Sequence, residues 1–201
     1  MSEPEEETGD DERSTAYVIE ELGNDYDKAF KRLNASISAS DAEGNHLYDE
    51  SQARDLYRAL FAYLEGTSFS VRMWSAKILL DEGTMDGFER SVVSEQATSL
   101  RDGEVVLTPM KISLQENIQF TFKLADRAHK RPTQTLDTSK VWWSDFKRAV
   151  KVRDRLMHPK LPNDLDISGD EVVLAIRVHH GFVDLLESYR PYRTSIAATH
   201  A

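Results

Sequence analysis

The chain has 201 residues, of which 40% are hydrophobic and 30% charged, and its formal net charge is −10. This length and composition suit one soluble globular domain with a well-buried core. The chain contains no cysteine, which excludes disulfides and thiolate chemistry, and no apolar run is long enough to cross a bilayer. The acidic N-terminus also lacks the features of a signal peptide. We therefore expect a cytoplasmic protein that does not enter a membrane.

The charge is distributed unevenly along the chain. Residues 1–13 hold seven acidic residues and one arginine. The segment 123–160 holds eleven lysines and arginines against four aspartates. Such asymmetry within an acidic protein indicates a surface that binds a polyanion, although a solvated helix face would show the same pattern.

The N-terminal region begins with a tail and continues as a helix. Residues 1–14 have almost no apolar content and are expected to be a disordered acidic tail. From Tyr17, apolar residues recur at spacings of three and four and predict a helix through Leu33. The segment 36–45 is rich in Ser, Asp and Gly and is expected to be a loop.

A long helix is predicted next, followed by less regular segments. Asp49 and Gln52 resemble a capping pair at the start of this helix, and Gly83 suits its end. A shorter helix is expected over 84–100, where the periodicity is thinner. Residues 105–107 are either a brief strand or an extended segment before a proline.

The remaining elements are also helices, and their ends carry clear signals. Residues 113–116 form a capping box, and residues 168–171 form a second one that opens the last helix. Ser139 is expected to cap the helix between them. This helix is predicted to end near His158, because Pro159 disfavours helical backbone at the residue before it.

Strand signals are scarce and no repeat is visible, so we predict an all-α fold, a bundle of about six helices. A single helical domain is expected over 15–190, followed by a C-terminal tail over 191–201.

The most informative segment chemically is Arg-Asp-Arg-Leu-Met-His-Pro-Lys, which begins at Arg153. RNA is cut without a metal when its 2′-hydroxyl attacks the neighbouring phosphate, a side chain moves the protons and a positive charge stabilises the phosphate. His158 suits proton transfer because histidine titrates near neutral pH, and Arg153 suits phosphate binding because a guanidinium binds bidentately. No metal and no cofactor are expected. Four further basic residues are expected to bind the RNA backbone: Arg148, Lys151, Arg155 and Lys160.

The spacing of this pair raises a geometric problem. Arg153 and His158 are five residues apart, which places them about 140° apart around an ideal helix. Asp154 and His158 are four apart and share a face. Arg153 and His158 therefore converge only if the helix ends before His158, or if a second copy of the chain completes the site.

An Arg-x4-His pattern with a polar residue after the arginine, late on an amphipathic helix, resembles the signature of HEPN-domain proteins. The strings WWSDFKRAVKVRDRLMHPK and DISGDEVVLAIRVHHGFVDLL resemble this superfamily more closely, and LYRALFAYLEGTSFSVRMWSAKILL and ENIQFTFKLADRA look similar to its preceding helices. The resemblance covers residues 47–188. Many members are metal-independent ribonucleases, several are toxins or anti-phage effectors, and their cleft is commonly built across a symmetric dimer.

The resemblance implies that Arg153 and His158 are the catalytic pair and that Asp154 takes the polar position, where Asn is frequent. A carboxylate there would repel RNA unless it orients His158 or pairs with Arg155. The implied partners are RNA, a second copy forming a homodimer with a composite active site, and an antitoxin or defence-complex protein. The alternative is a catalytically inactive HEPN-fold module that binds a partner protein, nucleotide or RNA.

Other candidate residues favour structural roles. Of His179 and His180, one ring is expected to pack inward and the other to face solvent, rather than both binding a metal. His129 is expected to join a basic rim. Of Trp142 and Trp143, one ring is expected to pack in the core and the other to be partly exposed. This is favoured over a surface that stacks on bases.

Glu65 lies near the middle of the long predicted helix, and the sequence leaves its role open. It is either a partner for Arg72 or Arg153, or it is exposed. The sequence has no Gly-rich phosphate loop, no Gly-x-Ser-x-Gly elbow and no His-Glu-x-x-His motif, so nucleotide hydrolases, serine hydrolases and zinc proteases are not supported.

Overall fold

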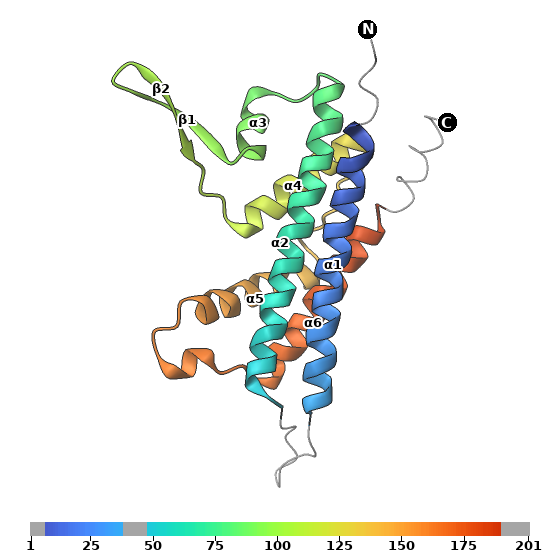
Figure 1. Ribbon diagram of the computed structural model, residues 1–201, viewed down its shortest axis with the longest axis vertical. Helices are drawn as coiled ribbons and strands as arrows, with labels where there is room; N and C mark the ends of the chain where they lie inside the picture. The colour runs from blue at the N-terminus through green and yellow to red at the C-terminus, as the bar shows by residue number, and fades with distance from the viewer. Residues whose placement is uncertain (1–6, 38–47, 190–201) are drawn as a thin grey trace. The chain divides into compact units, whose positions relative to one another are not determined.

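The computed structural model describes residues 7–37 and 48–189 (Figure 1). Within these ranges the chain forms six α-helices and a single two-stranded sheet, so the predicted all-α character is confirmed. The elements in chain order are α1 (Glu7–Ser36), α2 (Glu50–Asp81), α3 (Gly87–Val93), β1 (Gln96–Arg101), β2 (Glu104–Pro109), α4 (Leu114–Ala128), α5 (Val141–Met157), the short 3-10 helix η1 (Pro162–Leu165) and α6 (Gly169–Glu187).

The chain divides into two compact units. Unit 1 comprises residues 1–67 and 137–201, and unit 2 comprises residues 68–136. Helix α2 is continuous through both units, and Thr67 is its last residue in unit 1. The expected single domain over 15–190 stays a prediction.

Unit 1 is a helical bundle in which α5 and α6 pack against each other. Apolar side chains from all four of its α-helices are buried in its core, among them Tyr26, Leu33, Leu56, Leu60, Phe146, Leu174 and Phe182. The backbones of α5 and α6 approach closely at Gly181, where an added Cβ would lie 2.6 Å from the Cβ of Trp142. Trp143 is buried and Trp142 is half-buried, as predicted.

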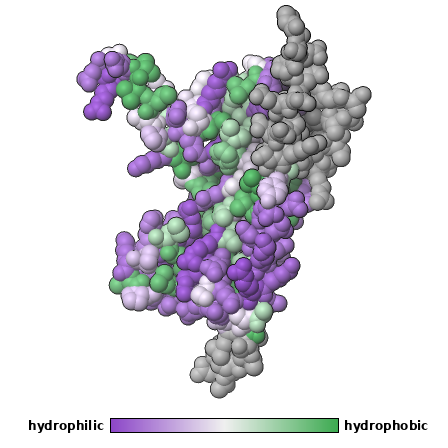
Figure 2. Space-filling model, viewed as in Figure 1, coloured by the Kyte–Doolittle hydropathy of each residue, from purple (hydrophilic) through white to green (hydrophobic). Residues whose placement is uncertain are grey.

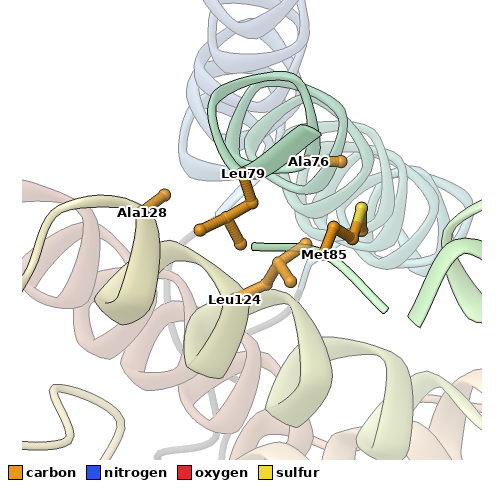
Figure 3. Close-up of a cluster of buried hydrophobic side chains, with 5 residues drawn as sticks. All are labelled: Ala76, Leu79, Met85, Leu124 and Ala128. Atoms are coloured by element: carbon orange, nitrogen blue, oxygen red, sulfur yellow. The ribbon is translucent and has the colours of Figure 1, made fainter. Parts of the chain in front are cut away.

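Unit 2 is built on the C-terminal part of α2 and on α4. Its core includes a cluster of small and medium apolar side chains (Figure 3), composed of Ala76, Leu79, Met85, Leu124 and Ala128. The predicted capping box begins α4, with the Ser113 hydroxyl accepting from the Glu116 backbone N–H at 3.2 Å. This cap fixes the start of the helix that covers the cluster.

A β-hairpin replaces the second half of the helix predicted over 84–100. Helix α3 ends at Val93, because Glu95 adopts a left-handed conformation with φ of 55°. Asp102 and Gly103 have φ values of 53° and 86°, as a tight two-residue hairpin turn requires. Residues 105–107, left open as strand or extended, lie in β2.

One face of this hairpin is apolar and exposed (Figure 2). The register pairs Leu100 with Val105 and Thr98 with Leu107, so these four side chains project from the same face. Leu100, Val105 and Leu107 are all exposed. The hairpin therefore contributes little to the core of unit 2.

Several predicted helix ends are confirmed. Asp49 accepts a hydrogen bond from the Ser51 backbone N–H at 2.8 Å and caps α2. Gly83 follows the end of α2 with φ of 67°. Helix α5 ends at Met157, directly before the residue that precedes Pro159.

Two predicted starts differ from the structure. Helix α1 begins at Glu7, so residues 7–14 are helical where the sequence predicted disorder. Ser139 does not cap α5: its hydroxyl donates to Asp137 at 2.6 Å, and Lys140 stands at the cap position without a side-chain bond. Residues 1–6 of the expected acidic tail and the expected C-terminal tail over 191–201 lie outside the described residues.

Candidate functional site

Arg153 projects from α5 toward α2 and is held there by two contacts. Its Nη2 atom donates to Glu65 Oε1 at 2.5 Å, and its guanidinium carbon lies 5.5 Å from the centre of the Phe61 ring. Phe61 and Glu65 are four residues apart on α2, so they share the helix face that receives Arg153. Glu65 is therefore the partner of Arg153, one of the alternatives that the sequence left open.

This ion pair is only half-buried. The Arg153 side chain is 32% exposed and the Glu65 side chain 42%. A second Arg153 nitrogen, Nη1, lies 3.5 Å from Asp154, at the limit of a hydrogen bond. The guanidinium is thus fixed in position while part of it remains open to solvent.

His158 stands at the C-terminal cap of α5 with an exposed side chain. Its backbone N–H donates to the Asp154 carbonyl at 3.1 Å, which closes the last turn of the helix. Within residues 7–37 and 48–189, its imidazole makes no hydrogen bond or ion pair, and none joins it to Arg153. In one copy of the chain, Arg153 and His158 thus lie near the same end of α5, and no hydrogen bond or ion pair joins their side chains.

Asp154 and Arg155 each lie beside a different charged residue. Arg155 Nη2 lies 3.0 Å from both carboxylate oxygens of Glu171, so its partner is on α6. Asp154 is exposed and lies beside Arg153, and in the described part of the chain it bonds neither the His158 ring nor Arg155. Of the two arrangements considered for Asp154, the described residues show neither, since Arg155 pairs with Glu171 instead.

The other predicted RNA-binding residues are exposed. Lys151 and Lys160 face solvent, and Arg148 is exposed while bonded to Asp145 at 3.2 Å. The backbone N–H groups of Lys160 and Leu161 donate to Asp164 at 2.7 and 2.8 Å, and these bonds hold the pKa of Asp164 below its usual range. The loop after His158 is thus ordered by its own backbone, which leaves the Lys160 side chain available.

Arg177 on α6 shares a carboxylate partner with Arg148, and the sequence reasoning did not identify it. Its Nε donates to Asp145 at 2.8 Å, so Asp145 receives arginines from two helices. A sequence signal existed: Asp145 precedes Phe146 on the apolar face of its helix, and a buried carboxylate requires a cationic partner. The partner lies thirty-two residues away, and its position on α6 was not predictable from local pattern.

Two of the other histidines that the structure describes, His179 and His129, are placed by packing. His179 stacks on Tyr26 with ring centres 3.8 Å apart, and His180 is exposed, as predicted. Burial lowers the pKa of His179 to about 4. His129 is buried beside Trp74 and does not join a basic rim; burial also lowers its pKa.

Two features are absent from residues 7–37 and 48–189. No group of three or more His, Asp or Glu side chains is arranged to hold a metal ion in that part of the chain. Likewise, none of its helices combines the length and apolar character needed to span a membrane.

Comparisons with protein-family models, curated proteins and solved structures found no match. The resemblance to HEPN proteins therefore rests on the residues themselves.

Proposed function

We propose that this chain is a metal-independent endoribonuclease of the HEPN type that acts in the cytoplasm, as a toxin or an anti-phage defence effector. One observation carries the proposal: Glu65 and Phe61 hold Arg153 in a defined, partly exposed position on the helix whose end exposes His158. A positioned guanidinium and an accessible imidazole supply a phosphate clamp and a proton carrier.

In the proposed reaction the 2′-oxygen of one nucleotide attacks the adjacent phosphorus. Its proton passes to a base, the bond from phosphorus to the 5′-oxygen breaks, and an acid protonates the leaving 5′-oxygen. The products are a 2′,3′-cyclic phosphate and a 5′-hydroxyl. His158 carries the proton, and Arg153 stabilises the extra negative charge on the phosphate oxygens in the transition state.

A homodimer with a composite site supports this chemistry better than a single chain. The bond-breaking step needs a base and an acid, and two copies of His158 supply both. Met157 and Leu161, which flank His158, expose apolar side chains that a second copy would bury. An antitoxin or defence-complex protein would bind the same exposed end of α5.

Cleavage of a mixed tRNA and mRNA sample in the presence of EDTA tests the proposal. His158→Ala is expected to slow cleavage about 100-fold to 10,000-fold, the usual effect of removing a general acid or base, with an unchanged circular dichroism spectrum. His180→Ala is the matched control, because His180 is exposed on α6 and has no assigned role. Equal cleavage rates for wild type and His158→Ala would contradict the proposal.

A non-catalytic HEPN-fold module that binds a partner protein, nucleotide or RNA is the second candidate. Two ion pairs favour it: Arg153 with Glu65, and Arg155 with Glu171. Each glutamate neutralises the charge of an arginine that was expected to bind RNA. Wild-type protein that leaves RNA intact in both EDTA and magnesium, while still binding it, would favour this candidate.

A further inference from the structure

A buried carboxylate in unit 1 holds two arginines at the surface. Asp145 lies on the inner side of α5, and only 6% of its side chain is exposed. Its Oδ1 accepts from Arg148 Nη1 at 3.2 Å, and its Oδ2 accepts from Arg177 Nε at 2.8 Å. The two guanidinium groups come from adjacent helices, α5 and α6, and are bound to the two oxygens of one carboxylate.

This cluster pairs two arginines with one buried carboxylate, and Asp170 acts on Arg177 from beyond ion-pair distance. One arginine would compensate one buried carboxylate, and a second adds repulsion between like charges. The side chains of Arg148 and Arg177 are 61% and 50% exposed, so the surplus charge faces solvent. An arrangement that served only to join α5 to α6 would not need the second guanidinium.

Each of the two arginines keeps nitrogens that do not bond Asp145. Arg177 uses Nε for Asp145 and keeps both Nη atoms, and Arg148 uses Nη1 and keeps Nε and Nη2. None of these remaining nitrogens bonds another residue that the structure describes. Each guanidinium therefore retains a pair of N–H donors suited to bidentate contact with phosphate oxygens, and the shared carboxylate holds the two side by side.

We propose that Arg148 and Arg177 together bind a backbone phosphate of the RNA, with Asp145 as the residue that positions them. This inference rests on the proposed ribonuclease function and extends its binding surface to α6. Lys151 follows Arg148 by one turn on the exposed side of α5, and His158 lies about 15 Å from Arg148 along the helix axis. An extended single strand of a few nucleotides would span from this clamp to the proposed point of cleavage.

Binding of a fluorescent single-stranded RNA, measured by anisotropy across a range of salt concentrations, tests this inference. The full-length chain carries His158→Ala throughout, so the RNA stays intact. Arg177→Gln and Arg148→Gln are each expected to weaken binding several-fold at low salt. Each should also reduce the slope of log Kd against log salt, and the two changes together should reduce it by about 0.7, the value for one phosphate contact on a single strand.

Lys28→Gln is the control for loss of charge. Lys28 is exposed on α1 and forms an ion pair with Asp25 at 3.1 Å, so this change also removes one charge and one surface pair. It should leave the slope unchanged. Arg148→Gln is the variant less disturbing to the fold, because it leaves the shorter Arg177–Asp145 pair intact. Its thermal unfolding should match that of the parent protein, so that weaker binding is not caused by misfolding.

The outcomes separate this inference from the proposed function. Slopes for Arg148→Gln and Arg177→Gln that equal the Lys28→Gln slope overturn the clamp, as does a parent protein that does not bind RNA at low salt. Failure of the wild type to cut RNA overturns the nuclease proposal, and the binding measurement on the His158→Ala background is still interpretable.

Discussion

Each unit contains an arginine that pairs with a glutamate and lies near a phenylalanine ring, and the two arginines differ sharply in exposure. In unit 1, Arg153 bonds Glu65 at 2.5 Å and its side chain is 32% exposed. In unit 2, Arg72 bonds Glu95 at 2.6 Å and its side chain is 1% exposed. Asn117 accepts a further bond from Arg72 at 2.5 Å.

This difference indicates which arginine is structural and which is available for chemistry. Arg72 is enclosed, so exchanging Glu95 for another anion would require opening unit 2. Arg153 exposes part of its guanidinium, and an incoming phosphate reaches it without unfolding. The residue type and its acidic partner are the same in both places, and burial distinguishes the two roles.

The largest expected effect is the loss of Arg72. Arg72→Ala should lower the free energy of unfolding by about 3 kcal/mol, the lower end for breaking a buried ion pair, because Glu95 is half-exposed and regains water. Arg101→Ala, at the exposed end of β1, should change it by less than about 0.5 kcal/mol. Chemical denaturation measures both, and equal effects would show that Arg72 is not the structural residue described here.

The next effect tests the packing of α5 on α6 in unit 1. Gly181→Ala should destabilise the protein by about 1–3 kcal/mol, because the new methyl group would press on Trp142. Gly169→Ala, at the start of α6, meets no atom within 4 Å and serves as the control. A Gly181→Ala protein as stable as the control would mean that the two helices are farther apart than described.

Changes at Glu65 separate the effect of its charge from its role in holding Arg153. Glu65→Gln keeps a hydrogen-bond acceptor but removes the competing charge, so RNA binding should tighten a few-fold while cleavage continues. Glu65→Ala should reduce cleavage about tenfold, because Arg153 loses its fixed position. Single-turnover cleavage and RNA titration separate the two effects; identical behaviour of the two variants would show that Glu65 does not position Arg153.

The smallest effect is a pH dependence to which each unit contributes through a histidine that packs against an aromatic ring. Burial lowers the pKa of His179 to about 4, whereas an unfolded histidine titrates near 6.5. The unfolded chain therefore binds a proton first as the pH falls. The stabilisation from neutral His179 is complete above about pH 6.5 and is lost as the pH falls toward about 4.

The Tm measured between neutral and mildly acidic pH should fall less steeply in His179→Phe, which keeps a ring against Tyr26. Part of the slope should remain, because burial also lowers the pKa of His129 in unit 2. An unchanged slope in the variant would assign the acid sensitivity to other groups.

Features set by neighbouring residues were predictable from the sequence. The capping boxes at Ser113 and Ser168 and the helix end before Pro159 depend only on local chemistry, and the structure contains all three. Ser139 failed as a cap because a nearby acceptor, Asp137, took its hydroxyl. The helix predicted over 84–100 failed because its weak periodicity did not reveal the left-handed turn at its centre.

Features that join distant segments were not predictable. Glu65 and Arg153 are eighty-eight residues apart, and the sequence offered Arg72 as an equal partner. Arg177 lies outside the basic segment that drew attention to α5, and only the packing of α6 places it beside Asp145. Because His129 lies next to Lys130, the sequence predicted that it joins a basic rim. Its burial depends on tertiary contacts of unit 2, which the local sequence does not show.

We propose that His158 and Arg153 cut RNA through attack by its own 2′-hydroxyl. The most direct test is incubation in EDTA of one RNA oligonucleotide and of the same sequence with 2′-deoxy nucleotides, followed by analysis of the fragment ends. We predict that wild type cuts only the RNA, leaving 2′,3′-cyclic phosphate and 5′-hydroxyl ends, and that His158→Ala leaves it intact. Cleavage of the 2′-deoxy strand, or fragments with other ends, would contradict the account.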